Sequence, residues 1–209
     1  MLKIAEEFIS IQGEGYYAGL PSYFIRCYGC NLRCDFCDST HAFNDEYYES
    51  DIDDIISRIE RTNVTNIVIT GGEPLLQKCD IEKLINKLKP IYSVEIETNG
   101  TCGFLENCNY QIVYNISPKL QFPNKIHEPV YRPSIYKFVF DSTEKTKERI
   151  LKFINDKHIP SSKVYIMPMG KTIDELSHHQ ENAVNFCIAN NFVYNHRVHV
   201  SIWNDKKGV

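Results

Sequence analysis

Residues 23–40 read YFIRCYGCNLRCDFCDST, an apolar run followed at once by a loop of closely spaced cysteines. The run Tyr23–Arg26 has the aromatic and β-branched composition of a strand. Cys30, Cys34 and Cys37 then follow with the spacing C-x3-C-x2-C. A strand that leads directly into a cysteine loop predicts a metal centre at the carboxyl end of that strand.

Three thiolates are one too few for an iron–sulfur cubane, which normally takes four. One iron is then open to a ligand that is not protein, and we expect chemistry there. Cys27 as a fourth ligand would instead give a closed electron-transfer cluster, although ferredoxins order their gaps differently. Cys27 ends an apolar run, where a free cysteine is usually a small buried hydrophobic residue.

A zinc module is the other alternative for this loop. Cys27, Cys30, Cys34 and Cys37 form C-x2-C-x3-C-x2-C. Zinc ribbons separate their two C-x2-C pairs by a long insert. The three residues between the pairs would crowd a tetrahedral site, and the spacing therefore disfavours zinc.

The composition favours a reducing interior and a small-molecule substrate. The chain has 209 residues, eight cysteines and a formal net charge of −4. It shows no signal segment and no apolar run near the roughly 18 residues of a membrane span. We expect one cytoplasmic domain, residues 1–209, with thiols reduced apart from the cluster ligands. The negative charge argues against nucleic acid as a partner, because nucleic-acid-binding proteins present basic patches.

Short apolar, β-branched segments predict six strands, at 23–26, 66–70, 94–97, 112–116, 136–140 and 164–167. A complete eight-stranded α/β barrel typically needs about 250 residues. About six parallel strands therefore predict a partial, incomplete TIM-like barrel, whose side opening would suit a large cofactor. The stretches 3–12 and 197–203 also have strand-like composition, and we expect them to add β structure at the edges or over the mouth.

Helices are predicted between these strands. Apolar residues recur at helical spacing over 52–59 and 81–88, with Ser50 placed to cap the first helix. Asp141 with Glu144 marks a third start, and Thr172 with Glu175 has capping-box spacing for a fourth. Alternating strands and helices predict a parallel sheet.

Five loops of unusual composition follow predicted strands. They are the cysteine loop, Gly71-Gly72-Glu73-Pro74, Thr98-Asn99-Gly100, Ser117-Pro118-Lys119 and Pro168-Met169-Gly170. Each alone is typical of a turn, since glycine, proline, asparagine and serine are frequent at strand ends. All five lie at the carboxyl ends of strands, the face of a βα barrel that carries the active site. We therefore expect them to converge on one pocket.

The cysteine spacing, with Phe36 before the last cysteine, resembles the cluster loop of radical S-adenosylmethionine (SAM) enzymes and implies the partial barrel of that superfamily. There the amino and carboxylate groups of SAM bind the fourth iron, and the GGEP motif contacts the same end of SAM. Gly71 and Gly72 leave room for this approach because they lack a Cβ. The resemblance implies SAM contacts from Phe36, Cys37, Asp38, Gly71, Gly72, Glu73, Glu97, Ser117, Pro118, Lys119, Met167, Pro168, Met169 and Gly170.

One of these loops departs from the pattern. Some relatives carry a glutamine and an aspartate on either side of Pro-Met, whereas this chain reads MPMG with Met167 first. Contacts to SAM from this loop are therefore expected from the backbone and from Met169.

Further motifs narrow the resemblance. The run SIQGEGYYAGLPSYFIRCYGCNLRCDFCDST (residues 10–40), with TGGEP, IETNG and ISPK, is similar to the 7-carboxy-7-deazaguanine synthase family over most of the chain. That family converts 6-carboxy-5,6,7,8-tetrahydropterin to 7-carboxy-7-deazaguanine with loss of ammonia, in queuosine and 7-deazapurine biosynthesis. The resemblance implies one [4Fe–4S] cluster, SAM used catalytically, Mg²⁺, a homodimer, and a reductant such as flavodoxin or ferredoxin.

The same resemblance implies the substrate contacts. A pterin carboxylate suits the Arg26 guanidinium, and a 2-aminopyrimidinone edge suits Glu14 and Gln12. The alternatives are a surface ion pair for Arg26 and a solvated turn for Glu14. The full implied set is Ile11, Gln12, Gly13, Glu14, Arg26, Thr70, His199 and the C-terminal carboxylate of Val209.

Magnesium takes few protein oxygens and keeps waters or substrate groups as its other ligands. In the family, its protein ligand is the hydroxyl directly after the Cys-Asp pair of the cluster loop. That position is Ser39, and Thr40 is the fallback.

Two other functions stay open. A glycyl-radical activating enzyme would share the cluster and GGEP but would need a surface for a large protein partner. A non-catalytic iron–sulfur carrier would use four cysteines and would not need GGEP, SPK or QGEG.

Overall fold

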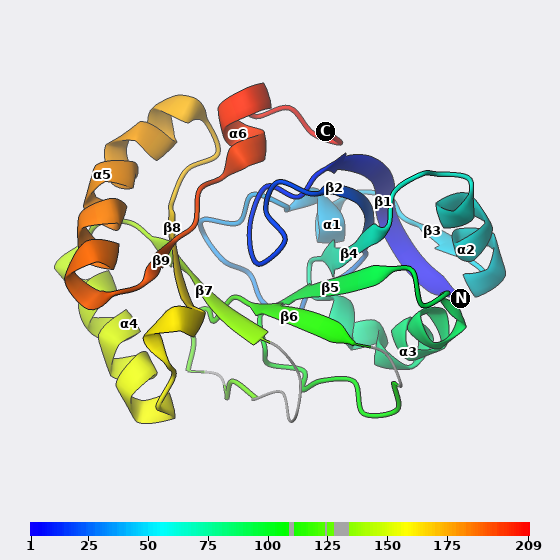
Figure 1. The fold of residues 1–209 in the computed structure, drawn as a ribbon, viewed down its shortest axis with the longest axis horizontal. Coiled ribbons are helices and arrows are strands. Elements are labelled where there is room, and N and C mark those ends of the chain that lie inside the picture. The colour runs from blue at the N-terminus through cyan, green and yellow to red at the C-terminus, as the bar shows by residue number, and fades with distance from the viewer. Residues whose placement is uncertain (109–110, 124, 128–133) are drawn as a thin grey trace.

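A curved nine-stranded sheet forms the centre of the part of the chain that the structure describes, in the order β3-β1-β2-β4-β5-β6-β7-β8-β9 (Figure 1). The computed structural model describes residues 1–108, 111–123, 125–127 and 134–209. The strands from β2 to β9 run parallel, and the strand order is open. They are β2 (Pro21–Cys27), β4 (Asn66–Gly71), β5 (Ser93–Thr98), β6 (Ile112–Ile116), β7 (Ser134–Phe140), β8 (Val164–Pro168) and β9 (Val193–Tyr194). The six predicted strands and the partial barrel are confirmed, and β9 is an addition.

The N-terminal stretch forms an antiparallel extension of this sheet. β1 (Leu2–Ile11) lies between β2 and β3 (Tyr48–Ser50) and pairs antiparallel with both. Phe8 lies opposite Phe24, and their rings stack with centroids 4.8 Å apart. The strand predicted at 3–12 is confirmed. Its pairing places the QGEG turn beyond the end of β1, next to the parallel strands.

The strand predicted at 197–203 is wrong. These residues form the short helix α6 (Val198–Trp203). Their β-branched and aromatic composition is typical of strands, but it is not decisive because tertiary contacts override propensity. The backbone NH of Val198 donates to the carbonyl of Gly13 at 3.0 Å. The segment is thereby attached to the N-terminal turn instead of continuing the sheet from β9.

The larger helices lie along the outside of the curved sheet (Figure 1). Helix α2 buries Ile55 and Ile59, and α3 buries Ile81, Leu84 and Ile85, so the predicted helical spacing is confirmed. None of the helices in the described ranges is long and apolar enough to cross a membrane. The helical elements are α1 (His41–Asn44), α2 (Ile52–Glu60), η1 (Pro74–Gln77), α3 (Lys78–Lys87), α4 (Glu144–Lys157), η2 (Ser161–Lys163), α5 (Ile173–Asn190) and α6.

One of the three predicted caps is confirmed. The Thr172 hydroxyl accepts a hydrogen bond from the NH of Glu175 at 3.2 Å. Ser50 does not cap α2, because it is the last residue of β3 and pairs with Leu2. Asp141 does not cap α4 either. Thr143 does, while the Asp141 carboxylate accepts from the NH and the hydroxyl of Thr143.

Candidate active site

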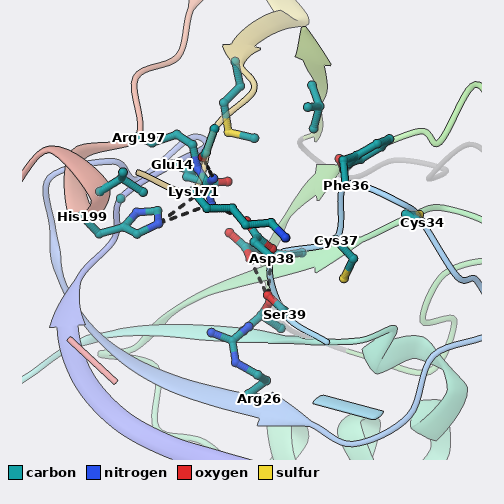
Figure 2. Close-up of a pocket in the computed structure, with 18 of the residues that line it drawn as sticks. Glu14, Arg26, Cys34, Phe36, Cys37, Asp38, Ser39, Lys171, Arg197 and His199 are labelled. Carbon is teal, nitrogen blue, oxygen red and sulfur yellow. Dashed lines mark hydrogen bonds and ion pairs between the residues drawn. The ribbon is translucent and has the colours of Figure 1, made fainter. Parts of the chain in front are cut away.

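A pocket of about 910 Å³ opens at the carboxyl ends of the parallel strands. The predicted loops after β2, β4, β5, β6 and β8 line it, together with the QGEG turn and the C-terminal segment. Figure 2 shows side chains of the QGEG turn, the cysteine loop and the C-terminal segment pointing toward one another. Three predicted site residues do not line the pocket: Thr40, Glu73 and Pro118.

The cysteine loop forms one wall. Cys30, Cys34 and Cys37 are free, partly buried and line the pocket. The loop folds back on itself, since the NH of Cys37 donates to the carbonyl of Cys34 at 3.1 Å. Burial raises the pKa of the Cys30 and Cys34 thiols. Cys27, in contrast, is fully buried in the hydrophobic core, and burial raises its pKa to about 12.

Ser39 and Thr40 differ in where they lie. Ser39 lines the pocket, and its hydroxyl donates to Asp38 Oδ1 at 3.0 Å. Thr40 is the N-terminal boundary residue of α1, and its backbone carbonyl accepts from Phe43 and Asn44. Of these two hydroxyl residues, only Ser39 lines the pocket.

Glu73 lies behind the pocket wall. Its buried carboxylate accepts from the NH of Leu75 at 3.0 Å, the hydroxyl of Thr98 at 2.7 Å and the NH of Asn99 at 2.7 Å. Asn99 in turn donates to Asn31 of the cysteine loop at 3.0 Å. Glu73 thus holds the glycine loop against the neighbouring loop, and its carboxylate is engaged by donors of the protein.

The wall from β6 presents a cation beside an aromatic ring. Lys119 Nζ donates to the Ser117 hydroxyl at 2.8 Å and lies 5.7 Å from the centroid of Phe36. Burial, assisted by the nearby charge of Lys137, lowers the pKa of Lys119. On the wall from β8, the NH of Met169 donates to the carbonyl of Phe140, the last residue of β7, at 2.9 Å.

A polar group lies at the floor, between the QGEG turn and the strands. Gln12 Nε2 donates to Glu95 at 2.8 Å and to Glu97 at 3.2 Å. The Thr70 hydroxyl donates to the second oxygen of Glu97 at 2.8 Å. Burial, followed by the charge of Glu97, raises the pKa of Glu95 to about 8.

Arg26 points into the pocket near Ser39 (Figure 2). Its Nε donates to Glu6 at 2.6 Å, and His41 Nε2 lies 3.1 Å from the same Glu6 oxygen. Burial raises the pKa of Glu6, but Arg26 and His41 outweigh it and hold the pKa below its usual value. Arg26 is thus in an ion pair, as in the surface alternative, yet it also lines the pocket.

Glu14 is buried between two cations. Lys137 Nζ donates to one carboxylate oxygen, and Arg197 Nε donates to the other at 2.8 Å. Burial opposes ionisation, but these two charges hold the pKa of Glu14 well below its usual value. His199 Nε2 lies 3.8 Å from Glu14, and burial lowers the pKa of His199 (Figure 2). The carboxylate expected to bind the pterin edge is therefore already paired within the protein.

The N-terminal turn and α6 are in close contact. A Cβ on Gly13 would lie 1.9 Å from His199 Nδ1. Gly15 has φ +75°, and its NH donates to Asn195 at 3.0 Å. The remaining implied substrate residues, Ile11 and the C-terminal Val209, also line the pocket.

Comparisons with known proteins identify the family of this chain. The model of the radical SAM superfamily matches residues 24–181. The chain is 31% identical to the 7-carboxy-7-deazaguanine synthase of Rhodopirellula baltica, over 99% of this chain and 88% of that protein. It is 33% identical to the 7-carboxy-7-deazaguanine synthase of Hyperthermus butylicus, over 81% of this chain and 77% of that protein.

The chain belongs to the 7-carboxy-7-deazaguanine synthase family. A solved structure, that of QueE from Escherichia coli, has the same fold, with a TM-score of 0.77 and 24% identity over 95% of this chain and 94% of that one. Membership of the radical SAM superfamily implies a [4Fe–4S] cluster and SAM.

The residues present fit those two groups. A Cβ on Gly72 would lie 2.3 Å from the carbonyl oxygen of Gly29 and 2.7 Å from Cys30 Cβ, so a larger residue would displace the cysteine loop. In the described part of the chain, no three His, Cys, Asp or Glu side chains are close enough together for a single metal ion. A cubane accepts thiolates that are farther apart, and its irons would favour ionisation of the Cys30 and Cys34 thiols.

Two charged residues that line the pocket, Lys137 and Arg197, were not identified from the sequence. Lys137 is a charged residue inside the apolar strand SIYKFVF, and that contrast could have marked it. Arg197 carries no such signal, since an isolated arginine near a chain end is usually exposed. Here it is only 6% exposed.

Proposed function

We propose that this chain converts 6-carboxy-5,6,7,8-tetrahydropterin to 7-carboxy-7-deazaguanine, with loss of ammonia. The observation that carries the proposal is the shared pocket. The QGEG turn, which carries the implied substrate residues, closes the same cavity into which the three thiols of the cysteine loop open. An iron–sulfur carrier has no use for such a cavity.

Cys30, Cys34 and Cys37 would hold the cluster, and Gly71 and Gly72 would leave room for SAM beside it. The cluster and SAM together would supply a 5′-deoxyadenosyl radical, and the protein would position the substrate for it. Lys119 and Ser117 would bind the carboxylate or ribose of SAM. Phe36 packs beneath Lys119 and restricts its orientation.

Arg26 would bind the substrate carboxylate. Glu6 accepts from its Nε and so fixes the plane of the guanidinium. A planar fork held in this way pairs with a carboxylate through its remaining nitrogens. Ser39, beside Arg26, would bind Mg²⁺, which takes its other ligands from water and the substrate carboxylate. Thr40, the alternative magnesium ligand, has no role in this proposal, because it does not line the pocket.

Glu14 would position the QGEG turn, because its two oxygens accept from Lys137 and Arg197. Backbone groups of Ile11, Gln12 and Gly13 would then provide the pterin contacts of this turn. The C-terminal segment, with His199 and Val209, would exclude water from the reaction.

The proposal extends to the assembly. We propose that residues 1–209 act as one domain, that two copies form a homodimer in the cytoplasm, and that flavodoxin or ferredoxin delivers the electron. Family membership supports these points by analogy alone.

Anaerobic reconstitution with iron and sulfide, followed by mass spectrometry, tests the activity. We expect 7-carboxy-7-deazaguanine and ammonia from the carboxypterin, SAM, Mg²⁺ and a reductant, with SAM recovered. Cys34→Ala is the matched control and should give neither. SAM cleavage without any change in the pterin would contradict the proposal and favour a glycyl-radical activating enzyme.

A further inference from the structure

Arg197 contacts three walls of the pocket at once. Its Nε donates to Glu14 of the QGEG turn at 2.8 Å. Its Nη1 donates to the carbonyl of Gly170, in the loop after β8, and its Nη2 donates to Asp38 in the cysteine loop. The side chain is almost fully buried, and Figure 2 shows it beside Glu14 and His199. These segments are far apart in the sequence and meet at this guanidinium.

The charges around Arg197 alternate. Lys137, Glu14, Arg197 and Asp38 form a row from β7 to the cysteine loop, in which each carboxylate contacts a cation. Lys137, Glu14 and Arg197 are largely buried, and breaking one partner out of such a pair is costly because it leaves the other charge without compensation. Asp38 ends the row at the pocket, where its side chain is 41% exposed. The row therefore resists separation of the turn from the cysteine loop.

Asp38 connects this row of charges to the expected cluster and magnesium ligands. It lies directly between Cys37 and Ser39, and it accepts from the Ser39 hydroxyl through the oxygen that does not receive Arg197. A shift of Asp38 would therefore move a cluster ligand and the proposed magnesium ligand together. No other arginine or lysine donates to Asp38 in the ranges the structure describes.

We propose that Arg197 is a positioning residue, which sets the cysteine loop and Ser39 against the QGEG turn by binding Asp38 and Glu14 at the same time. The part that concerns Mg²⁺ rests on the function proposed above, whereas the part that concerns the cysteine loop does not. Arginine suits this task because its guanidinium presents donors in a rigid fork. A lysine ammonium on a flexible stem can serve one partner well, but not all three in this geometry.

Direct binding of the substrate carboxylate by Arg197 is the competing explanation. Each of its nitrogens already donates to a protein oxygen, and His199 Nε2 lies 3.5 Å from Nη2. Arg26 has only Nε engaged by a described residue, namely Glu6. The substrate carboxylate is therefore better served by Arg26, and Arg197 acts through Asp38.

The first test uses the reconstituted holoenzyme without pterin. An iron chelator is added, and the loss of cluster absorbance is followed in wild type, Arg197→Met, Asp38→Asn and the double variant. We expect both single variants to lose the cluster about tenfold faster, because each breaks the same charged contact. The double variant should be no faster than either one, since residues that act through one contact are not additive.

Arg58→Met is the matched control. Arg58 also donates to two partners, Glu7 at 2.7 Å and Ser50 at 2.9 Å, but it does not line the pocket. It should lose the cluster at the wild-type rate. The melting temperature of each apoprotein identifies a variant that has failed to fold. If Arg197→Met fails to fold, Arg197→Lys takes its place, with an expected intermediate rate.

The second test uses turnover. In Arg197→Met, the Mg²⁺ concentration for half-maximal rate should rise about tenfold, while that for SAM should change less than about threefold. A general loss of structure would raise both. Two results would overturn the inference. One is that Arg197→Met loses the cluster at the wild-type rate, and the other is that the effects of the two substitutions on this rate are fully additive. A wild-type protein that makes no product from the pterin would refute the proposed function and leave the chelation result standing.

Discussion

At the scale of single residues, consecutive side chains at the end of the cysteine loop have different surroundings. Ser39 opens into the pocket, whereas Thr40 begins a helix with its backbone. Asp38 lies beside them and is held by Arg197 from one side and by Ser39 from the other. Neighbouring residues with the same hydroxyl group therefore have different surroundings, and substitutions should distinguish them.

Ser39→Ala should lower the rate of carboxypterin turnover about tenfold or more and flatten its response to added Mg²⁺, because a bound cation contributes several kcal/mol of charge stabilisation. The cluster absorbance should not change, since the hydroxyl contacts Asp38 and no cysteine. Thr40→Ala should keep the wild-type magnesium titration. The reverse pattern would assign the ion to Thr40.

At the scale of elements, helix starts hold the active-site loops in place. Thr172 caps α5 immediately after the loop Pro168-Met169-Gly170. The Glu175 carboxylate reaches back to the NH of Lys171 at 2.6 Å. Gly170 has φ +154°, and a Cβ there would lie 2.6 Å from the NH of Leu176, so the loop must approach the helix closely. The cap therefore stabilises both the helix and a wall of the pocket.

Thr172→Ala should reduce the free energy of unfolding of the apoprotein by about 1 kcal/mol, the usual cost of losing a side-chain cap. Urea denaturation under anaerobic conditions measures it. Thr40→Ala is the matched control, because Thr40 precedes α1 without a side-chain cap, and its cost should stay below about 0.5 kcal/mol. Equal losses in the two variants would mean that the Thr172 hydroxyl bond adds nothing.

Local sequence predicts elements well and their ends less well. The six parallel strands and the amphipathic faces of α2 and α3 follow from patterns within a few residues. The start of α2 does not, because Ser50 is drawn into a strand by pairing with Leu2. Nor does α6, whose strand-like composition is outweighed by a contact to Gly13. In each case a distant residue decides between two locally acceptable structures.

At the scale of the whole molecule, contacts between distant residues also limit how much of the site can be predicted from sequence. The loops that line the pocket could be predicted, since each follows a recognisable strand. The surroundings of Glu14 could not, because its partner Lys137 lies 123 positions later and Arg197 lies 183 positions later. Sequence shows which side chains can carry charge, whereas the fold determines which charges neutralise one another.

The buried floor makes stability depend on pH. Burial and Glu97 raise the pKa of Glu95 from 4.5 to about 8, so the folded protein favours the neutral acid. Its contribution to stability is complete below pH about 4.5 and is lost as the pH rises to about 8. Glu95→Gln removes this titration.

Melting temperatures of the apoproteins, measured from about pH 5 to about pH 9, test this dependence. The difference between Glu95→Gln and wild type should move in favour of the variant as the pH rises, whatever its starting value. A difference that stays constant over this range would mean that Glu95 ionises normally in the folded protein.

The contact between Gly13 and α6 has a consequence for folding. The turn that carries the implied pterin contacts is completed by residues 197–203, which follow every strand of the sheet in the sequence. Loops that join such distant segments close slowly, because chain entropy must be lost before any contact forms. The strands from β2 to β8 can pair without residues 197–203, but the pocket cannot close without them. A cluster inserted before this contact forms would meet a cysteine loop that Arg197 does not yet hold.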